Sequence, residues 1–143
     1  MKIFYHTSAT ATGGRDGHTR IDDGSLGFDL VGFSSQSGKV GTNPEQLFAM
    51  GYAACFDSAM NHVAPSLGIK PTKSSTTVGV SIGQKADGAF ALDLDITITV
   101  EGISVDDAKK LIQKAHEVCP YSNATRGNVD VRLKVNVVQS FDL

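Results

Sequence analysis

The chain has 143 residues, of which 41% are hydrophobic and 20% are charged, and its formal net charge is −2. This length fits a single domain, residues 1–143, with a workable core. The mildly acidic balance gives no electrostatic reason to expect nucleic acid or an anionic membrane as a partner.

No targeting segment is visible at the N-terminus, which reads Met-Lys-Ile-Phe-Tyr-His without an apolar core or a cleavage site. The longest apolar run, from Leu47 to Phe56, is too short to span a bilayer, which takes about 20 residues. We therefore expect a cytoplasmic protein, a setting in which a permanent structural disulfide is not favoured.

The N-terminal third predicts short strands over residues 3–12, 18–22 and 25–33, because apolar residues alternate there between Gly-containing turns. Residues 34–42 are rich in Ser and Gly and predict a loop.

A long helix is expected from the cap Asn43 to about Val63. Pro44 suits its first position, and Gln46 stands three residues after Asn43, as in a capping box. Residues 47–56 are apolar nearly all round, which is typical of a central helix.

Alternating sequence over residues 76–84 and 89–100 predicts a hairpin, with residues 85–88 as its turn, and residues 129–138 predict a last strand. A second helix is expected to begin at Ser104. Its apolar residues follow helical spacing: Val105, Ala108, Leu111, Ile112, Ala115 and Cys119. Pro120 disfavours helical geometry at Cys119, so this helix is expected to end there.

The predicted order is βββ-α-ββ-α-β, with the strands grouped together. Such an order favours the α+β class with a mostly antiparallel sheet.

The two cysteines, Cys55 and Cys119, lie on the apolar sides of the two predicted helices and suggest a redox couple. A cysteine reacts as its thiolate. Cys55 is twelve residues past Asn43, too far for the helix N-terminus to lower its pKa, and burial would raise that pKa. A reactive Cys55 therefore needs a cation. Arg15, set among glycines, is the first candidate, and Arg126 is the second.

A buried arginine needs a carboxylate partner, and Glu45 is the only acid of the first helix ahead of Cys55. The ten residues between Glu45 and Cys55 correspond to about 15 Å of helix. We therefore expect the Arg15 guanidinium to lie between Glu45 and Cys55, the alternative being a bend of the helix at Gly51. The apolar side chains of Phe48, Met50 and Tyr52 are the candidates for binding an organic substrate.

Each candidate also has a purely structural interpretation. Cys55 and Cys119 would then be small packing residues, Arg15 a solvated turn residue, and Glu45 an acid that serves the helix dipole. For three further polar residues we expect structural rather than catalytic roles: Asp57, Tyr121 and Arg126. The four histidines and the cysteines form no metal-ligand spacing, so no metal site is expected.

Three segments together resemble the organic hydroperoxide resistance proteins of the wider Ohr/OsmC family of thiol peroxidases. They are residues 9–17, 41–56 and 118–128, and the resemblance extends over nearly the whole chain. The run Cys119-Pro-Tyr-Ser-Asn-Ala-Thr-Arg is similar to the hydroperoxide-resistance branch and not to the osmotically induced branch.

The resemblance implies an OsmC-like fold, an intertwined homodimer and two active sites at the subunit boundary. It matches Cys55 to the peroxidatic cysteine, Cys119 to the resolving cysteine, and Arg15 and Glu45 to the pair that activates the attacking thiol. It also implies alkyl and fatty-acid hydroperoxides as substrates, a Cys55–Cys119 disulfide, and reduction by a dihydrolipoyl-type dithiol. No haem, flavin or metal cofactor is implied.

Three alternatives to this function remain. The nearest is a peroxidase of the osmotically induced branch with a broader peroxide range. The others are a non-enzymatic module that binds a hydrophobic ligand and a redox sensor whose disulfide alters partner binding.

Overall fold

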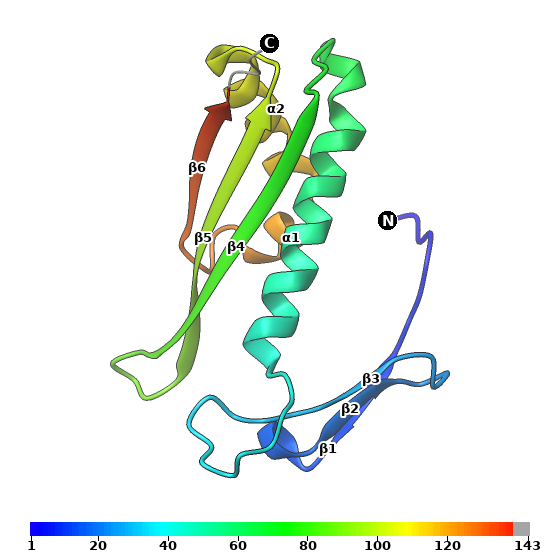
Figure 1. Ribbon diagram of the computed structural model, residues 1–143, viewed down its shortest axis with the longest axis vertical. Helices are drawn as coiled ribbons and strands as arrows, with labels where there is room; N and C mark the ends of the chain where they lie inside the picture. Colours follow the sequence, from blue (N-terminus) through cyan, green and yellow to red (C-terminus); the bar gives the residue numbers. More distant parts are fainter. Residues whose placement is uncertain (139–143) are drawn as a thin grey trace. The chain divides into compact units, whose positions relative to one another are not determined.

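The computed structural model describes residues 1–138 (Figure 1). The chain divides into two compact units, Met1–Leu47 and Phe48–Leu143. The first contains three short strands, and the second contains a sheet of three longer strands with helices. The α+β class expected from the element order is confirmed.

The first unit is built on an antiparallel sheet of β1 (Ala9–Thr12), β2 (His18–Ile21) and β3 (Gly27–Asp29). The expected strand over residues 3–12 is wrong in its first half, because β2 offers only four residues and its pairing with β1 ends at Ala9 opposite Ile21. The third strand is likewise shorter than expected. Local alternation identified these strands, but the length of the partner strand sets where each one ends.

This small sheet has almost no core of its own. Within residues 1–47, all of which the structure describes, Leu30 is the one buried residue. Large apolar side chains are exposed instead, among them Phe4 (87%), Tyr5 (81%) and Phe33 (69%). Sheets of this size need an apolar face packed against something to be stable, and exposed apolar side chains of this size are unfavourable in water.

Helix α1 (Pro44–Val63) begins and ends as the sequence predicts. The Asn43 side chain accepts a hydrogen bond from the Gln46 amide at 2.8 Å, which confirms the cap. One face of α1 is buried, through Tyr52, Phe56, Ala59, Met60 and Val63. Met50, on another face, is 55% exposed.

The sheet of the second unit contains β4 (Lys73–Gln84), β5 (Phe90–Glu101) and β6 (Val131–Val138), with β5 in the middle. Strands β4 and β5 form the predicted hairpin, whose turn is closed by the Lys85 amide bonded to the Ala89 carbonyl at 2.8 Å. Strand β6 pairs with β5 in parallel, a direction that alternation in a strand does not encode.

The core lies on one face of this sheet. Alternate residues of β5, from Leu94 through Ile96 and Ile98 to Val100, are fully buried. They share a single apolar cluster with the buried faces of α1 and α2 (Val105–Val118). In Figure 1, α1 runs alongside the long strands of this sheet.

Helix α2 has the predicted cap, since Ser104 Oγ accepts a hydrogen bond from the Asp107 amide at 3.1 Å. It ends at Cys119, as expected, but a short helix that the sequence analysis missed follows at once: α3 (Pro120–Thr125). Proline is tolerated at the first position of a helix, where the amide has no partner in any case. Pro120 therefore ends one helix and begins the next.

Candidate active site

The two cysteines, 64 positions apart in the chain, lie together in the second unit. Cys55 comes from the middle of α1 and Cys119 from the junction of α2 and α3, and their sulfurs are 3.6 Å apart. Cys55 is partly buried, whereas Cys119 is fully buried. A disulfide bond is about 2.05 Å long, so these are two thiols in contact, close enough for a bond to form after a small movement.

The junction of the two helices fixes where the Cys119 thiol lies. The Cys119 amide donates to the Ala115 carbonyl at 2.8 Å and closes the last turn of α2. The Cys119 carbonyl accepts from the Asn123 amide at 2.9 Å and starts α3. Cys119 itself is extended, with φ −63° and ψ 123°, as expected for a residue before proline. Hydrogen bonds to α2 on one side and to α3 on the other therefore fix the backbone position from which the Cys119 side chain extends.

The surroundings of Cys55 within the second unit disfavour its thiolate. Burial raises the pKa of the Cys55 thiol above its usual value, and the adjacent Cys119 thiol raises it further. The main-chain amide of Tyr121 acts in the opposite direction but does not cancel these effects. The raised pKa agrees with the sequence argument that a reactive Cys55 needs a cation.

Gly51 allows α3 to approach α1 next to this site. A Cβ atom at Gly51 would lie 2.7 Å from the Tyr121 hydroxyl, a distance that real contacts do not show. The Tyr121 ring also packs against Phe48 and Tyr52, with ring centroids 5.9 and 5.5 Å away. Gly51 precedes Cys55 by one helical turn and lies on the same face of α1. The glycine thus allows the Tyr121 ring of α3 to pack closely on α1.

Arg15 and Glu45 form a bidentate ion pair in the first unit. Arg15 Nη1 donates to Glu45 Oε2 at 2.8 Å and Nη2 donates to Oε1 at 2.6 Å. The Glu45 side chain is only 13% exposed. The hydrogen bonds from Arg15 lower the pKa of Glu45, so the carboxylate stays charged at neutral pH. The predicted pairing of these two residues is present.

The loop that carries Arg15 depends on its glycines. Gly13 and Gly14 have φ of 76° and 60°, in the left-handed region that favours glycine. At Gly17 an added Cβ would lie 1.8 Å from the Thr12 carbonyl oxygen. The Arg15 guanidinium carbon also lies 6.0 Å from the centre of the Phe33 ring, within the range of cation–π attraction. A tight turn and two partners therefore fix this guanidinium.

The ion pair belongs to the first unit and the sulfur pair to the second. Helix α1 carries one member of each, Glu45 in its first turn and Cys55 ten residues later.

An apolar pocket of about 470 Å³ opens in the second unit. It is lined by Phe48, Leu92, Pro120, Tyr121, Ala124, Thr125, Asn128 and Val129. Two of these, Pro120 and Tyr121, directly follow Cys119 in the chain. Of the three substrate-binding candidates, only Phe48 lines this pocket. Tyr52 is fully buried, and Met50 is an exposed residue of α1.

Comparison with known proteins gives a consistent family assignment. The OsmC-like protein family matches residues 36–134. The organic hydroperoxide resistance protein OhrB of Bacillus subtilis is 42% identical over 132 residues, which cover 92% of this chain and 97% of that protein. The chain belongs to the OsmC-like family, in its organic hydroperoxide resistance branch.

Solved structures of this branch have the same fold. An organic hydroperoxide resistance protein from Legionella pneumophila is 47% identical, with a TM-score of 0.88, covering 95% of this chain and all of that one. One from Elizabethkingia anophelis is 46% identical, with a TM-score of 0.89, covering 96% of this chain and all of that one. The OsmC-like fold expected from the three motif segments is therefore confirmed.

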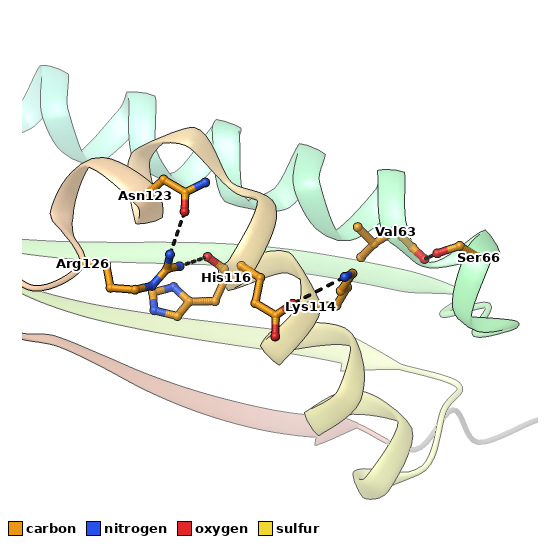
Figure 2. Close-up of polar contacts among 7 residues, drawn as sticks. Val63, Ser66, Lys114, His116, Asn123 and Arg126 are labelled. Carbon is orange, nitrogen blue, oxygen red and sulfur yellow. Dashed lines mark hydrogen bonds and ion pairs between the residues drawn. The ribbon is translucent and has the colours of Figure 1, made fainter. Parts of the chain in front are cut away.

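Other polar residues of this OsmC-like chain have structural partners. Asp57 accepts hydrogen bonds from the Ser74 and Thr76 hydroxyls, at 3.3 and 3.2 Å, and ties α1 to β4. Arg126, the second candidate cation, donates to Asn123 Oδ1 at 2.6 Å and to the His116 carbonyl, as Figure 2 shows. These two hydrogen bonds hold α3 to the end of α2.

A buried polar cluster, which the sequence analysis did not find, lies beside the sulfurs. Ser122 and Thr125 of α3 are buried and both contact the hydroxyl of Tyr52. The sequence contains Tyr-x-x-Cys on α1 and Cys-x-x-Ser across the start of α3, but these spacings indicate a cluster only once the two helices are known to be in contact.

Over residues 1–138, no group of three or more His, Cys, Asp or Glu side chains is arranged to hold a metal ion. The same residues contain no helix of the length and apolarity needed to cross a membrane.

Proposed function

We propose that this OsmC-like chain acts in peroxide detoxification, as a thiol peroxidase that reduces organic hydroperoxides to alcohols. The observation that supports this most directly is the 3.6 Å approach of the Cys55 and Cys119 sulfurs. The names of its relatives, organic hydroperoxide resistance proteins, indicate the substrate class.

In the first step, the Cys55 thiolate attacks the outer oxygen of ROOH. The O–O bond breaks, a proton is taken up, and ROH leaves while Cys55 becomes a sulfenic acid. The oxidant is the hydroperoxide itself, which gains the two electrons that the sulfur loses. Cys119 then displaces the sulfenic oxygen as water and a Cys55–Cys119 disulfide forms. An external dithiol, of the dihydrolipoyl type, restores both thiols by exchange.

Arg15 is proposed as the cation that stabilises the Cys55 thiolate and the charge developing on the peroxide oxygens. Its bidentate pair with Glu45 supports this role, because two hydrogen bonds to a largely buried carboxylate fix the position of the guanidinium. The need for such a cation follows from the raised pKa of Cys55. Glu45 is proposed as a positioning residue that acts through Arg15.

The apolar pocket supports a preference for organic over hydrogen peroxide. Its lining from Phe48, Leu92, Tyr121 and Val129 offers hydrocarbon surface to an alkyl group. Burying each methylene of a substrate contributes about 0.8 kcal/mol, which hydrogen peroxide cannot gain.

A second copy of this chain is proposed as the partner that covers the exposed apolar residues of the first unit. Residues Ile3, Phe4 and Tyr5 are between 66% and 87% exposed in the single chain, which is unfavourable in water. Sedimentation velocity should give the mass of a dimer. A monomer at micromolar concentration would contradict this.

The proposed function is tested by steady-state turnover of t-butyl or cumene hydroperoxide with three reductants: dihydrolipoamide, reduced thioredoxin and glutathione. We expect turnover with dihydrolipoamide and a higher rate with the organic hydroperoxides than with hydrogen peroxide. A non-enzymatic binding module would lose no thiols after one equivalent of organic hydroperoxide. Retention of both thiols in that titration would refute the peroxidase proposal.

Replacement of Cys119 by Ser is expected to separate the two half-reactions. The variant should still consume one equivalent of hydroperoxide at Cys55 but should then stop, because no thiol is present to form the disulfide. Under excess peroxide, Cys55 should advance to sulfinic acid, which mass spectrometry detects as an added mass of two oxygens. Over-oxidation equal to that of the wild-type chain would show that Cys119 is not the resolving thiol.

A further inference from the structure

One buried serine joins three helices of the second unit. Ser122 of α3 is fully buried, and its Oγ lies 2.7 Å from the Tyr52 hydroxyl of α1 and 2.9 Å from His116 Nδ1 of α2. Tyr52 is fully buried as well, and Thr125 Oγ1 lies 3.4 Å from the same hydroxyl. A single side-chain oxygen thus ties α3 both to the helix of Cys55 and to the helix that ends at Cys119.

The position of this contact along the helices matters for the sulfurs. Tyr52 precedes Cys55 by three residues, so both lie on one face of α1. Ser122 follows Cys119 by three residues, at the start of α3. The Tyr52–Ser122 hydrogen bond and the Cys55–Cys119 contact therefore join the same two segments, one helical turn apart. A displacement of the backbone segment that carries Cys119 and Ser122 away from α1 therefore strains this hydrogen bond as well.

His116 and Arg126 support the serine from the other side. Burial, and then the Arg126 guanidinium, lower the pKa of His116, so its imidazole is neutral at neutral pH. A neutral imidazole protonated at Nε2 accepts a hydrogen bond at Nδ1. In that tautomer, the Ser122 hydroxyl would donate to His116 Nδ1 and would remain free to accept a hydrogen bond from the Tyr52 hydroxyl. Arg126 holds the His116 carbonyl and Asn123 together (Figure 2), which fixes α3 at the end of α2.

We propose that Ser122, bridged to Tyr52 and His116, is a positioning residue that holds the Cys119 thiol against Cys55 for disulfide formation. This inference rests on the proposed peroxidase function. The step concerned is the condensation of Cys55–SOH with the Cys119 thiol: the S–S bond forms, the S–O bond breaks, and the thiol proton leaves with the hydroxyl as water. No further oxidant or reductant enters.

Positioning matters here because a second reaction competes for the same intermediate. Another molecule of hydroperoxide converts the sulfenic acid to a sulfinic acid and releases a second alcohol. Disulfide formation needs the two sulfurs at bonding distance with a narrow range of dihedral angles. A Cys119 thiol held near that geometry condenses before the second hydroperoxide reacts. The ratio of disulfide to sulfinic acid among the products therefore measures how well the Cys119 thiol is held next to Cys55.

The experiment removes single hydroxyls with Ser122→Ala and, separately, Tyr52→Phe. Each variant is mixed with cumene hydroperoxide, quenched at set times and analysed by mass spectrometry for sulfenic acid, disulfide and sulfinic acid. We expect an unchanged rate of Cys55 oxidation, disulfide formation slowed about tenfold, and a matching rise in the sulfinic fraction, as the loss of one buried hydrogen bond implies. Ser122→Thr, which keeps a hydroxyl, should restore much of the disulfide.

Ser66→Ala is the matched control. Its hydroxyl donates to the Val63 carbonyl at 2.7 Å just beyond the end of α1, as Figure 2 shows, and it is eleven residues from Cys55 in sequence. This variant loses a serine hydroxyl and a hydrogen bond of similar length but should keep the wild-type division of products. Circular dichroism identifies any variant that fails to fold, and Tyr52→Phe then carries the test if Ser122→Ala does not fold.

Two outcomes overturn the inference while leaving the peroxidase proposal intact. One is a wild-type ratio of disulfide to sulfinic acid in folded Ser122→Ala and Tyr52→Phe. The other is an equal shift of that ratio in Ser66→Ala, which would indicate general loosening rather than positioning. If wild-type Cys55 itself does not react with the hydroperoxide, the proposed function fails instead, and the two failures are distinguishable in the first sample.

Discussion

Replacing Cys55 by Ser is expected to abolish consumption of cumene hydroperoxide. A serine hydroxyl in place of the thiol has no accessible anion at neutral pH and no oxidation states to cycle through, so the first bond to oxygen cannot form. The remaining thiol, Cys119, can then react with hydroperoxide only by slow, uncatalysed oxidation. We therefore expect the rate of hydroperoxide consumption to fall to that of the reagents without protein. Residual peroxide measured over time gives this rate.

The matched control for Cys55→Ser is Cys55→Ala, which keeps the site apolar. Cys55 packs against the core and is partly buried, so a serine there could also lower stability. If both variants are inactive and fold as judged by circular dichroism, the loss is chemical. Sustained turnover by either variant would refute the assignment of Cys55 as the peroxidatic cysteine.

Replacing Arg15 by Ala is expected to reduce the second-order rate with hydroperoxide by a factor on the order of 10² to 10³, the usual effect of losing one preorganised group that stabilises developing charge. It should also raise the pKa of Cys55 further. Burial and Cys119 already shift that pKa upward, so the fraction of thiolate at a given pH falls when the proposed cation is removed. In a Cys119→Ser background, the rate of iodoacetamide alkylation against pH reports Cys55 alone.

The sign of this pH effect is definite. Alkylation follows the thiolate, so its rate rises as pH passes upward through the pKa of Cys55, and Arg15→Ala should move the midpoint to higher pH. Glu45→Gln should move it in the same direction but less, because the guanidinium remains while its bidentate partner is lost.

Arg20→Ala is the matched control for Arg15→Ala. Arg20 is an exposed arginine of β2 in the same unit, so its removal changes the net charge equally. An unshifted midpoint in Arg15→Ala would exclude Arg15 as the activating cation and direct attention to Arg126.

Elements whose boundaries depend on neighbouring residues were predictable from the sequence. Asn43 and Ser104 cap their helices as expected, and residues 85–88 form the hairpin turn. These features depend on side chains within four positions of the backbone groups that they satisfy. The short α3 was missed because a proline can either end a helix or begin one. From the sequence, Pro120 was interpreted only as the end of the second helix.

The candidate site residues could be identified for a different reason, because cysteine and arginine have few possible roles in the sequence settings where they occur here. Two cysteines on apolar helix faces and an arginine among glycines are unusual enough to be noticed. The Tyr52–Ser122–His116 cluster escaped notice because tyrosine, serine and histidine have many ordinary uses. They can be recognised as a cluster only in the folded chain, where three helices place the Tyr52 hydroxyl and His116 Nδ1 each within 3 Å of Ser122 Oγ.

The sequence by itself determined the helices, the long hairpin, the family and the identity of the thiols, because local capping, periodicity and motif residues encode these. Only the tertiary structure decided that the sulfurs of Cys55 and Cys119 lie 3.6 Å apart, that β6 joins β5 in parallel, and that Ser122 links α1 to α3. These contacts join segments at least 30 residues apart in the chain. Packing of the shared core brings these segments together, and a pattern within a short stretch of sequence does not predict such packing.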